Sequence, residues 1–465
     1  MTRVHLIGIC GTAMGTLAAL LKHRGFRVSG SDEKVYPPMS DFLAAEGIPI
    51  VEGYRADHIT DDIDVVVIGN AISRGNPELE TVLDRKMRHV SLPEALREHF
   101  LWNARSIVIA GTHGKTTTTA ISGWLLADGG VDPTVFIGGI ARNFGNGGSS
   151  YRIGAANAPF VIEGDEYDSA FFDKTAKFLK YLPDIAVINN IEFDHADIYQ
   201  DLDAVRLAFL RLVKLVPRRG LTLLGIDSPE AAALAGKALS RVQTFGTADG
   251  ADWQAVDIQA DGTSTTFRLS HGGRDEGTFS LPLLGVHNVR NALAALAVAR
   301  DCGVDIEALR RGLPAFLGVK RRLEVVGSRR DVVVYDDFAH HPTAVAETLS
   351  ALRAAQPGHR IWAIFEPRSA SSCRRVFQDD FARAFAAADQ VVIASVFRSS
   401  LPPAERLSED ELVNDLRRAG TAARHLPDVD TIVKEVTSEA RAGDLVVVMS
   451  NGGFGGIHGK LLDSL

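Results

Sequence analysis

The segment from Ser106 to Thr119 constrains the fold more than any other part of the sequence. It begins with the apolar run Ser106–Ala110, which has the length and the Val and Ile content of a buried strand. The loop Gly111-Thr112-His113-Gly114-Lys115-Thr116 follows, and a helical pattern comes directly after it. A strand, a glycine-containing loop and a helix in this order form the repeating unit of parallel α/β sheets. The segment therefore predicts an α/β protein.

The same loop has the residue types that hold nucleotide phosphates. Glycines let backbone N–H groups point at phosphate oxygens, and a helix N-terminus adds partial positive charge. Lys115 can then reach the β- and γ-phosphates, and the Thr116 hydroxyl can bind Mg²⁺. The match is incomplete, because Ile109 stands where the usual pattern has its first glycine. A tight turn with an exposed lysine is the alternative, but the β-branched run Thr116–Thr119 is a poor helix start unless a hydroxyl is needed there.

The alternation of apolar runs and helical patterns continues along all 465 residues, a length that suits about three domains. We expect an N-terminal Rossmann-like domain over 1–103, a central phosphate-loop domain with a mostly parallel sheet over 104–319, and a C-terminal Rossmann-like domain over 320–465. Between Asp252 and Pro282, polar alternating segments predict a small antiparallel hairpin layer. Other expected elements are the strands Val4–Ile9, Arg27–Ser31, Asp64–Ile68, Phe160–Glu163, Ile185–Asn189, Leu221–Leu224, Val332–Tyr335, Ile361–Phe365, Gln390–Ala394 and Leu445–Met449, and the helix Asn288–Arg300.

Composition and charge exclude several classes of protein. Hydrophobic residues make up 46% of the chain, which provides for packed cores and excludes a disordered protein. The net charge of −8 gives no basic surface for nucleic acid. Three scattered cysteines allow neither a disulfide framework nor a zinc motif. No apolar stretch approaches the ~18 residues of a membrane span, and the first residues do not resemble a signal peptide. We expect a soluble cytoplasmic protein.

Acidic residues gather directly after two predicted strands of the central domain. The run Gly164-Asp165-Glu166-Tyr167-Asp168 follows one strand, and Asn190–Asp197 follows the next. Open α/β sheets bind ligands at the carboxyl ends of their strands, so a carboxylate here would hold Mg²⁺ beside the phosphate loop. Glu166 is the preferred ligand, and a solvated acidic turn is the alternative. Mg²⁺ prefers oxygen, so generic chemistry does not favour His195 as a direct ligand.

The first domain has a glycine-containing turn of its own, Gly8-Ile9-Cys10-Gly11-Thr12-Ala13-Met14-Gly15, between a predicted strand and a helix. It resembles a dinucleotide-binding turn without the usual glycine spacing, and Asp32 stands where an acid would meet a ribose hydroxyl. These features predict a diphosphate-containing ligand. They keep a nicotinamide-dependent oxidoreductase as an alternative class, and a nucleotide-regulated binding protein as another.

Three predicted strands of the last domain also end in polar loops, at residues 336–342, 366–372 and 450–456. All three loops fall on the edge of the sheet where ligands bind. Arg368, in the second loop, suits a bidentate contact with a carboxylate. Ordinary loop chemistry is the alternative for each stretch.

Several of these motifs together resemble the Mur ligases of peptidoglycan synthesis. They are Gly111–Thr119, the acidic stretch around Glu166, Asn190–His195, His287-Asn288-x-x-Asn291 and Arg321-Arg322. They span essentially the whole chain in the family's order, and the family's phosphate loop has the same shortened form. The resemblance implies an ATP-dependent ligase with Mg²⁺ as cofactor. Such an enzyme activates a carboxylate as an acyl phosphate, joins it to an amine, and releases ADP and phosphate.

Further stretches resemble family members that use UDP-N-acetylmuramate: Gly8–Gly15, Ser31–Met39, Glu163–Lys174, Glu366–Ser369 and Met449–His458. The resemblance favours a member of murein recycling that joins this substrate to the muropeptide-derived tripeptide L-alanyl-γ-D-glutamyl-meso-diaminopimelate. A member that adds L-alanine is the alternative. Several relatives carry a carbamylated lysine where this chain has Phe209, and its absence groups the chain with the muramate users. No nucleic-acid or membrane partner is expected, and the protein is expected to be a monomer or a weak homodimer.

The resemblance also assigns ATP and metal contacts to individual residues. ATP is expected to contact Gly111, Thr112, His113, Gly114, Lys115, Thr116 and Thr117, with His287 and Asn291 at the adenine, Asp337 or its neighbour Asp336 at the ribose, and Arg322 or else Arg321 at the γ-phosphate. Mg²⁺ is expected at Thr116, Glu166 and His195.

The two remaining substrates and the catalytic groups are assigned in the same way. The UDP substrate is expected at Gly8, Gly11, Thr12, Met14, Gly15 and Asp32, and the peptide at Arg368, Ser369 and Asn451. The expected catalytic residues are Lys115, His195 and Arg322. His341 is a candidate for the base that takes the amine proton, with a structural role as the alternative.

Overall fold

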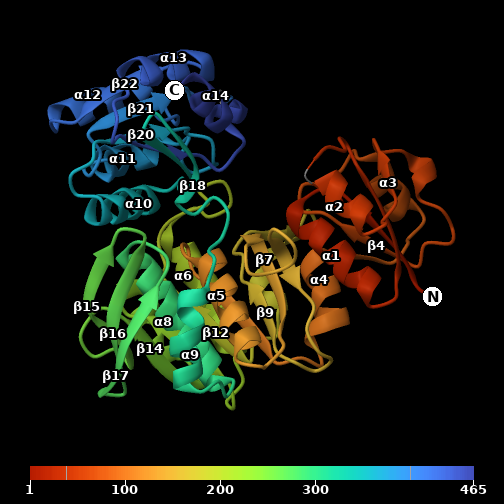
Figure 1. Ribbon diagram of the computed structural model, residues 1–465. Coiled ribbons are helices and arrows are strands. Elements are labelled where there is room, and N and C mark those ends of the chain that lie inside the picture. The colour runs from red at the N-terminus through yellow and green to blue at the C-terminus, as the bar shows by residue number, and fades with distance from the viewer. Residues whose placement is uncertain (38, 398–399) are drawn as a thin grey trace.

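The computed structural model describes residues 1–37, 39–397 and 400–465, which fold into three α/β domains in sequence order (Figure 1). Pro38, within the stretch Ser31–Met39 discussed above, lies outside the described residues. In Figure 1 the N-terminal domain lies to the right of the central domain and the C-terminal domain lies above it. The predicted fold class is confirmed, because each domain has a mostly parallel sheet flanked by helices.

The N-terminal domain has a five-stranded parallel sheet in the order β3-β2-β1-β4-β5. The chain order reverses between β1 and β4, and ligands of such sheets bind at this point. The first strand ends at Ile7 rather than at Ile9 as expected, because Gly8 turns the chain with a φ of +83°. The elements are β1 (Arg3–Ile7), α1 (Thr12–His23), β2 (Arg27–Asp32), α2 (Met39–Ala45), β3 (Ile50–Glu52), β4 (Val65–Ile68), α3 (Pro77–Asp84), β5 (His89–Ser91) and α4 (Leu92–Leu96).

The central domain is built on one ten-stranded sheet in the order β17-β16-β15-β14-β13-β12-β6-β9-β7-β8. Its strands are β6 (Ser106–Ala110), β7 (Thr134–Ala141), β8 (Ser149–Arg152), β9 (Phe160–Glu163), β12 (Ile185–Ile188), β13 (Leu221–Gly225), β14 (Arg241–Gly246), β15 (Trp253–Asp261), β16 (Ser264–His271) and β17 (Arg274–Leu281). The short hairpin of β10 (Asp168–Ala170) and β11 (Asp173–Ala176) stands apart from it. The helices are α5 (Lys115–Asp128), α6 (Leu202–Leu215), α7 (Pro229–Ala232), α8 (Val286–Asp301) and α9 (Ile306–Gly312).

Strand order in this sheet decides which loops meet. The strand β6 pairs in parallel with β9 on one side and with β12 on the other. The phosphate loop after β6 is therefore flanked by the two acidic loops that follow β9 and β12. The antiparallel segments that the sequence predicts after Asp252 are the strands β15, β16 and β17. They extend the same sheet, because β15 pairs with β14 through Trp253 and Gln254.

The C-terminal domain has six strands in the order β18-β19-β23-β20-β21-β22, of which β18 alone is antiparallel to its neighbour. The last strand, β23, lies between β19 and β20, so the polar loops that follow these three strands are neighbours. The elements are β18 (Glu324–Arg329), β19 (Val332–Asp337), α10 (Pro342–Ala355), β20 (Ile361–Phe365), α11 (Gln378–Ala384), β21 (Gln390–Ala394), α12 (Glu409–Arg418), β22 (Ala422–Leu426), α13 (Val429–Glu439), β23 (Leu445–Met449) and α14 (Ile457–Ser464).

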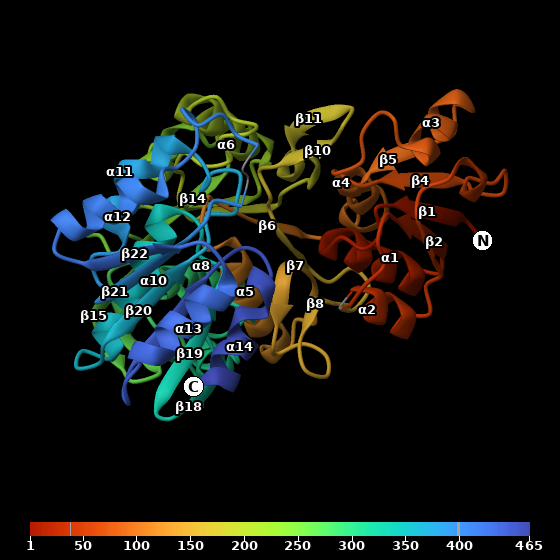
Figure 2. The same cartoon turned by 90° about the horizontal axis from the view of Figure 1, so that it is seen from above.

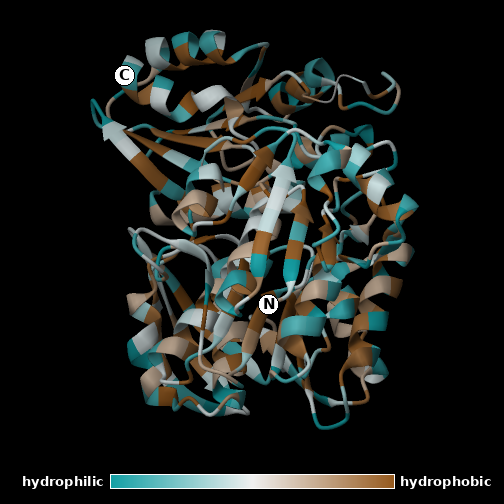
Figure 3. Cartoon of the chain, turned by 90° about the vertical axis from the view of Figure 1, so that its right-hand side faces the viewer, coloured by the Kyte–Doolittle hydropathy of each residue, from teal (hydrophilic) through white to brown (hydrophobic). Residues whose placement is uncertain are grey.

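The inner strands are buried on both faces. Every residue of β6, β12, β20 and β23 is buried, as expected for parallel strands covered by helices on two sides. Figure 3 shows hydrophobic colour on the strands inside the domains and hydrophilic colour on outer helices and loops. Seen from above, helices lie over the sheets of all three domains (Figure 2). Among the described residues, no helix combines the length and the apolar character needed to cross a bilayer.

Phe209 lies on the inner face of α6. Its side chain is fully buried, and its ring centre lies 5.4 Å from that of Phe178. Leu207, two residues earlier on the same helix, is 45% exposed. Phe209 is therefore part of the hydrophobic core under the acidic loops.

We expect Phe209→Ala to lower the free energy of unfolding by about 3–5 kcal/mol, because it removes a buried ring and leaves a cavity. Leu207→Ala shortens an exposed side chain on the same helix and should change stability by about 0.5 kcal/mol or less. Urea unfolding followed by circular dichroism measures both variants. Equal losses in the two variants would contradict a core role for Phe209.

Candidate active site

The phosphate loop leaves the end of β6 and enters α5 at Lys115. Gly111 and Gly114 have φ values of +133° and +80°, which side chains rarely adopt. A Cβ on Gly114 would lie 2.2 Å from Asn291 Oδ1, and a Cβ on Gly111 would lie 3.0 Å from the Asn189 backbone nitrogen. Both positions therefore require glycine, for backbone conformation and for space.

Two asparagines at the end of β12 hold this loop from one side. Asn190 accepts the Thr112 backbone N–H through its carbonyl at 3.0 Å and the His113 N–H through its side chain at 2.8 Å. Asn189 Nδ2 donates to the Thr118 hydroxyl at 3.0 Å. Asn189 was not predicted as a separate site residue, although a polar residue at the end of a buried strand is a usable signal.

The predicted adenine contacts come from α8. The Asn291 side chain accepts a hydrogen bond from Thr118 Oγ1 at 3.1 Å and donates to Asn288 Oδ1 at 3.2 Å. It therefore lies directly behind the phosphate loop. His287 lies at the start of the same helix, and burial lowers the pKa of its imidazole.

Lys115, Glu166 and His195 form a buried charged contact at the centre of the site. Lys115 Nζ donates to Glu166 Oε1 at 2.9 Å and to the Gly111 carbonyl at 2.7 Å. His195 Nε2 lies 2.9 Å from the same carboxylate oxygen. Burial works against the charge of Lys115, but the attraction of Glu166 and Asp165 outweighs it and raises the pKa of the lysine. The structure thus brings these three predicted residues together.

The same residues fit a bound Mg²⁺. Glu166 Oε2 is buried and has no hydrogen-bond partner within the described residues, so a carboxylate oxygen is available for a further contact. Oxygen donors at Thr116 and Glu166 match the preference of Mg²⁺. His195 completes the group with a nitrogen donor next to the carboxylate.

Glu163 is a site residue that sequence reasoning missed. The Thr116 hydroxyl donates to Glu163 Oε1 at 2.9 Å, and the Gly138 N–H donates to Oε2 at 2.7 Å. Burial raises the pKa of the Glu163 carboxyl. An acid at the last position of the apolar strand β9 was the signal that could have identified it.

The two adjacent arginines at the start of the C-terminal domain point to different places. Arg322 Nη2 lies 3.2 Å from the Thr116 hydroxyl and thus faces the phosphate loop. Arg321 Nη2 donates to the Ser450 carbonyl at 2.6 Å, and its Nε lies 3.1 Å from Asp336 Oδ2. Burial lowers the pKa of the Arg322 guanidinium, and the carboxylates of Asp337 and Glu163 oppose this effect only in part.

Asp337, expected at the ribose, holds backbone groups of its own domain. Its carboxylate accepts the N–H groups of Leu323 at 2.6 Å and Ala339 at 2.7 Å, and burial raises its pKa. Asp336 is engaged by Arg321. These bonds fix the linker that carries Arg322.

The C-terminal domain reaches the acidic loop after β12 through Ser371. The His195 backbone N–H donates to Ser371 Oγ at 2.9 Å, and the Ser371 hydroxyl donates to the Asp194 carboxylate. The sequence pointed to Ser369 in this stretch, but the Ser369 hydroxyl is turned to Ser372 at 2.8 Å. Ser371 was missed because only the docked domains reveal its partner.

The other two residues expected to bind peptide lie around the same loop edge. The Arg368 guanidinium stacks over the Phe397 ring at 3.6 Å from its centre. A Cβ on Gly452 would lie 2.2 Å from Arg368 Nε, so the loop after β23 passes directly beside this arginine. Asn451 in that loop has a buried Oδ1 without a hydrogen-bond partner in the described part of the chain.

The glycine turn of the N-terminal domain lies apart from the phosphate loop. The Cys10 N–H donates to Asp32 Oδ2 at 2.8 Å, so Asp32 holds the turn in place. A Cβ on Gly15 would lie 2.4 Å from Met39 Cε, so the end of the Met39 side chain packs against this glycine. Gly8, Gly11, Thr12 and Met14 belong to the same turn and the start of α1. The helix contacts the central domain through Thr16 Oγ1 and Ser150 Oγ, 2.7 Å apart.

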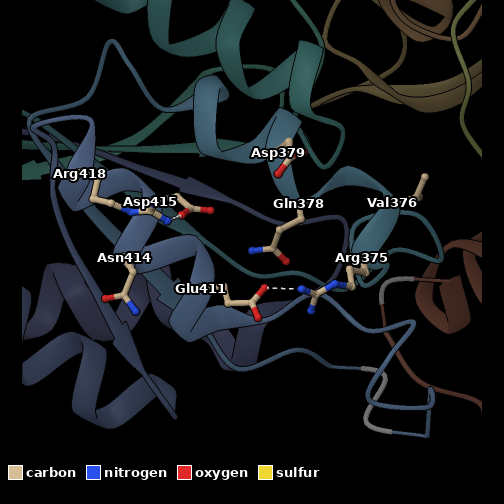
Figure 4. Close-up of a pocket in the computed structure, with 8 residues that line it drawn as sticks. All are labelled: Arg375, Val376, Gln378, Asp379, Glu411, Asn414, Asp415 and Arg418. Carbon is tan, nitrogen blue, oxygen red and sulfur yellow. Dashed lines mark hydrogen bonds and ion pairs between the residues drawn. The ribbon is translucent and has the colours of Figure 1, made fainter.

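A separate pocket of about 450 Å³ lies between α11 and α12 (Figure 4). Four of its charged groups form two ion pairs: Arg375 Nη2 lies 2.7 Å from Glu411, and Arg418 pairs with Asp415. None of the residues that the sequence predicts for the site lines this pocket.

Comparison with known proteins matches all three domains. Residues 3–101 match "Mur ligase family, catalytic domain", residues 109–299 match "Mur ligase middle domain", and residues 321–452 match "Mur ligase, glutamate ligase domain". The chain is 41% identical over 468 residues to the UDP-N-acetylmuramate–L-alanyl-γ-D-glutamyl-meso-2,6-diaminoheptandioate ligase of Haemophilus influenzae, covering 100% of this chain and 99% of the relative.

Two further relatives bear on the substrates. The UDP-N-acetylmuramate–L-alanine ligase of Brucella ovis is 37% identical over 458 residues, covering 97% of this chain and 94% of the relative. The crystal structure of a murein peptide ligase from Psychrobacter arcticus is similar with a TM-score of 0.73 and 37% identity, covering 100% of this chain and 98% of the other.

We expect Gly114→Ala to weaken binding of a non-hydrolysable ATP analogue at least ~10-fold, because a methyl group would displace Asn291 and strain the loop. Gly130→Ala is the matched control, since Gly130 has a φ of +81° but no atom within 4 Å of an added Cβ. It should carry similar backbone strain and leave nucleotide affinity unchanged. Isothermal titration calorimetry measures both, and unchanged affinity in Gly114→Ala would contradict the nucleotide site.

Proposed function

The chain belongs to the Mur ligase family, and we propose from this premise that it joins UDP-N-acetylmuramate to the tripeptide L-alanyl-γ-D-glutamyl-meso-diaminopimelate in murein recycling. It is an ATP-dependent ligase that forms a C–N bond. The observation that carries the proposal is the 41% identity, over the whole chain, to a ligase of that specificity. The L-alanine ligase of Brucella ovis is less similar, at 37%.

The proposed reaction has two chemical steps. A lactyl carboxylate oxygen of UDP-N-acetylmuramate attacks the γ-phosphorus of ATP, and the bond to ADP breaks to give an acyl phosphate. The alanyl amine of the tripeptide then attacks the carbonyl carbon. The C–O bond to phosphate breaks, phosphate leaves, and the nitrogen passes a proton to the departing phosphate or to water. Both steps concentrate negative charge, so the site must supply positive charge and hydrogen-bond donors.

The residues around the phosphate loop suit this task. Lys115, held at the loop by Gly111 and Glu166, would donate to the β- and γ-phosphates. Arg322, directed at Thr116, would contact the γ-phosphate. Thr116, Glu166 and His195 would hold Mg²⁺, which when bound offsets charge between carboxylate and phosphate. His287 and Asn291 would lie towards the adenine. Asp337 would contact the ribose or would hold the linker that carries Arg322.

The other two substrates approach from the flanking domains in this proposal. The turn from Gly8 to Gly15, fixed by Asp32, would bind the UDP group at the sheet edge of the N-terminal domain. Arg368 and Asn451 would contact the tripeptide from the C-terminal domain, with Ser369 shaping the loop between them. The enzyme would act in the cytoplasm as a monomer or weak homodimer.

Lys115→Ala should reduce ATP turnover at least ~1000-fold, because it removes the donor closest to the charge that develops on phosphate. Binding of UDP-N-acetylmuramate, measured by calorimetry, should stay nearly unchanged, since that site lies in another domain. Lys460→Ala removes a surface lysine paired with Asp430 at 2.7 Å and serves as the control with normal turnover. Substantial turnover in Lys115→Ala would refute the phosphate-loop assignment.

Phosphate release tests the amine substrate directly. With ATP, Mg²⁺ and UDP-N-acetylmuramate, the tripeptide should give a kcat/KM at least ~10-fold higher than L-alanine, since more contacts form in the transition state. Preference for L-alanine would move the assignment to the alternative ligase. ATP binding without phosphate release in the presence of either amine would instead favour a nucleotide-regulated binding protein.

A further inference from the structure

Three side chains that can each bind a metal ion meet where the phosphate loop faces the C-terminal domain. They are His113 in the phosphate loop, Glu192 in the loop after β12, and His341 immediately before α10. One nitrogen or carboxylate oxygen from each lies within 4.8 Å of the other two. The group therefore combines two segments of the central domain with one of the C-terminal domain.

The distances match the spacing of ligands around one metal ion. His113 Nε2 lies 3.3 Å from Glu192 Oε2, and His341 Nδ1 lies 3.6 Å from the same oxygen. Two ligands at about 2.1 Å from a tetrahedral ion lie about 3.4 Å apart. Small rotations of these side chains would thus bring all three atoms to one ion.

Neighbouring groups orient the ligands as metal sites require. His341 Nε2 lies 3.1 Å from the Phe193 carbonyl, which places the ring proton on Nε2 and leaves the Nδ1 lone pair facing Glu192. Metal-binding histidines commonly donate their other N–H to a backbone carbonyl in this way. The Thr343 hydroxyl donates to Glu192 Oε2 at 2.6 Å and fixes the carboxylate. The Thr343 N–H reaches His341 Nδ1 only at 3.4 Å, a contact that an ion can replace.

Burial favours the protonation states that bind metal. The side chains of His341 and His113 are 6% and 14% exposed. Burial lowers the pKa of His341 to about 4, so its imidazole is neutral near pH 7. Burial also works against the charge of Glu192, but its contacts with His113, Thr343 and His341 together outweigh this and lower the pKa of the carboxyl to about 2. A neutral imidazole and an ionised carboxylate are the forms that coordinate a metal.

An ion has a path to this cluster. A pocket of about 450 Å³ between the two domains has Glu192 and His341 in its wall, and it continues along α10 and α11 to Asp380 and Arg383. It can also supply water for a fourth coordination position.

We propose that His113, Glu192 and His341 form a binding site for a divalent transition-metal ion, with Zn²⁺ as the best-fitting ion, distinct from the magnesium site at Glu166. Two imidazoles and one carboxylate with an open position suit Zn²⁺ and related ions, whereas Mg²⁺ favours oxygen ligands. Because the ligands come from two domains, the ion links the phosphate loop to the C-terminal domain and stabilises their docked arrangement.

Zn²⁺ titration of the full chain against a fluorescent chelator, with Mg²⁺ in excess, tests the site. We expect one tight site in the unmodified protein and at least ~100-fold weaker binding in His341→Ala, since even outer-shell changes cost 10–100-fold. His425→Ala is the matched control, because His425 pairs with a single carboxylate, Asp410, at 3.7 Å. His195→Ala alters the magnesium site and leaves the three proposed ligands in place. Both His425→Ala and His195→Ala should keep the tight Zn²⁺ site.

Two further measurements test the proposal even if the His341→Ala variant fails to fold. Glu192→Gln keeps the side-chain shape and an acceptor for Thr343 but removes the charge, and it should also weaken Zn²⁺ binding. Co²⁺ bound to the unmodified protein should give the strong visible absorption of a four-coordinate ion. The proposal is overturned if no tight site exists, if Zn²⁺ binding survives in Glu192→Gln and His341→Ala, or if it is lost in His195→Ala.

Discussion

The buried contact among Lys115, Glu166 and His195 is the interaction on which the rest of the site depends. Three charged or polar groups are kept away from water here, and such groups are tolerated only when they are paired. The pairing exists because β9, β6 and β12 are adjacent and parallel, so the loops that follow them leave the same edge of the sheet. The glycines of the phosphate loop let its backbone lie directly against Asn189 and Asn291. Sheet order and loop packing together set the position of each group.

The second constraint is that the site is shared between domains. Arg322 and Ser371 belong to the C-terminal domain but contact Thr116 and His195 of the central domain. A reaction that forms an acyl phosphate needs water excluded and positive charge supplied together, and in the docked arrangement Arg322 lies beside the phosphate loop. The cluster of His113, Glu192 and His341 lies at this same junction. An ion bound there would therefore act on docking as well as on the phosphate loop.

Local sequence signals predicted much of the fold and part of the site. The strand before Gly111, the glycine loop and Glu166 each follow from residue types within a few positions. Glu163 was missed because the residue pattern favours the acid in the loop over the acid at the strand end, and only the partner Thr116 distinguishes them. The segments after Asp252 were expected as a small antiparallel hairpin layer, and they do pair antiparallel. Their place at the edge of the main sheet depends on the pairing of β15 with β14, which no local pattern encodes.

The sequence by itself determined the alternation of strands and helices, the phosphate loop and the resemblance to one ligase family, because each of these depends on neighbouring residues or on ordered motifs. The tertiary structure alone decided which group faces which. Arg321 and Arg322 are adjacent and chemically identical, yet one is held by Ser450 and Asp336 and the other is directed at Thr116. That difference arises from the linker fixed by Asp337 and from the docking of two domains, and such long-range contacts form only when the whole chain has folded.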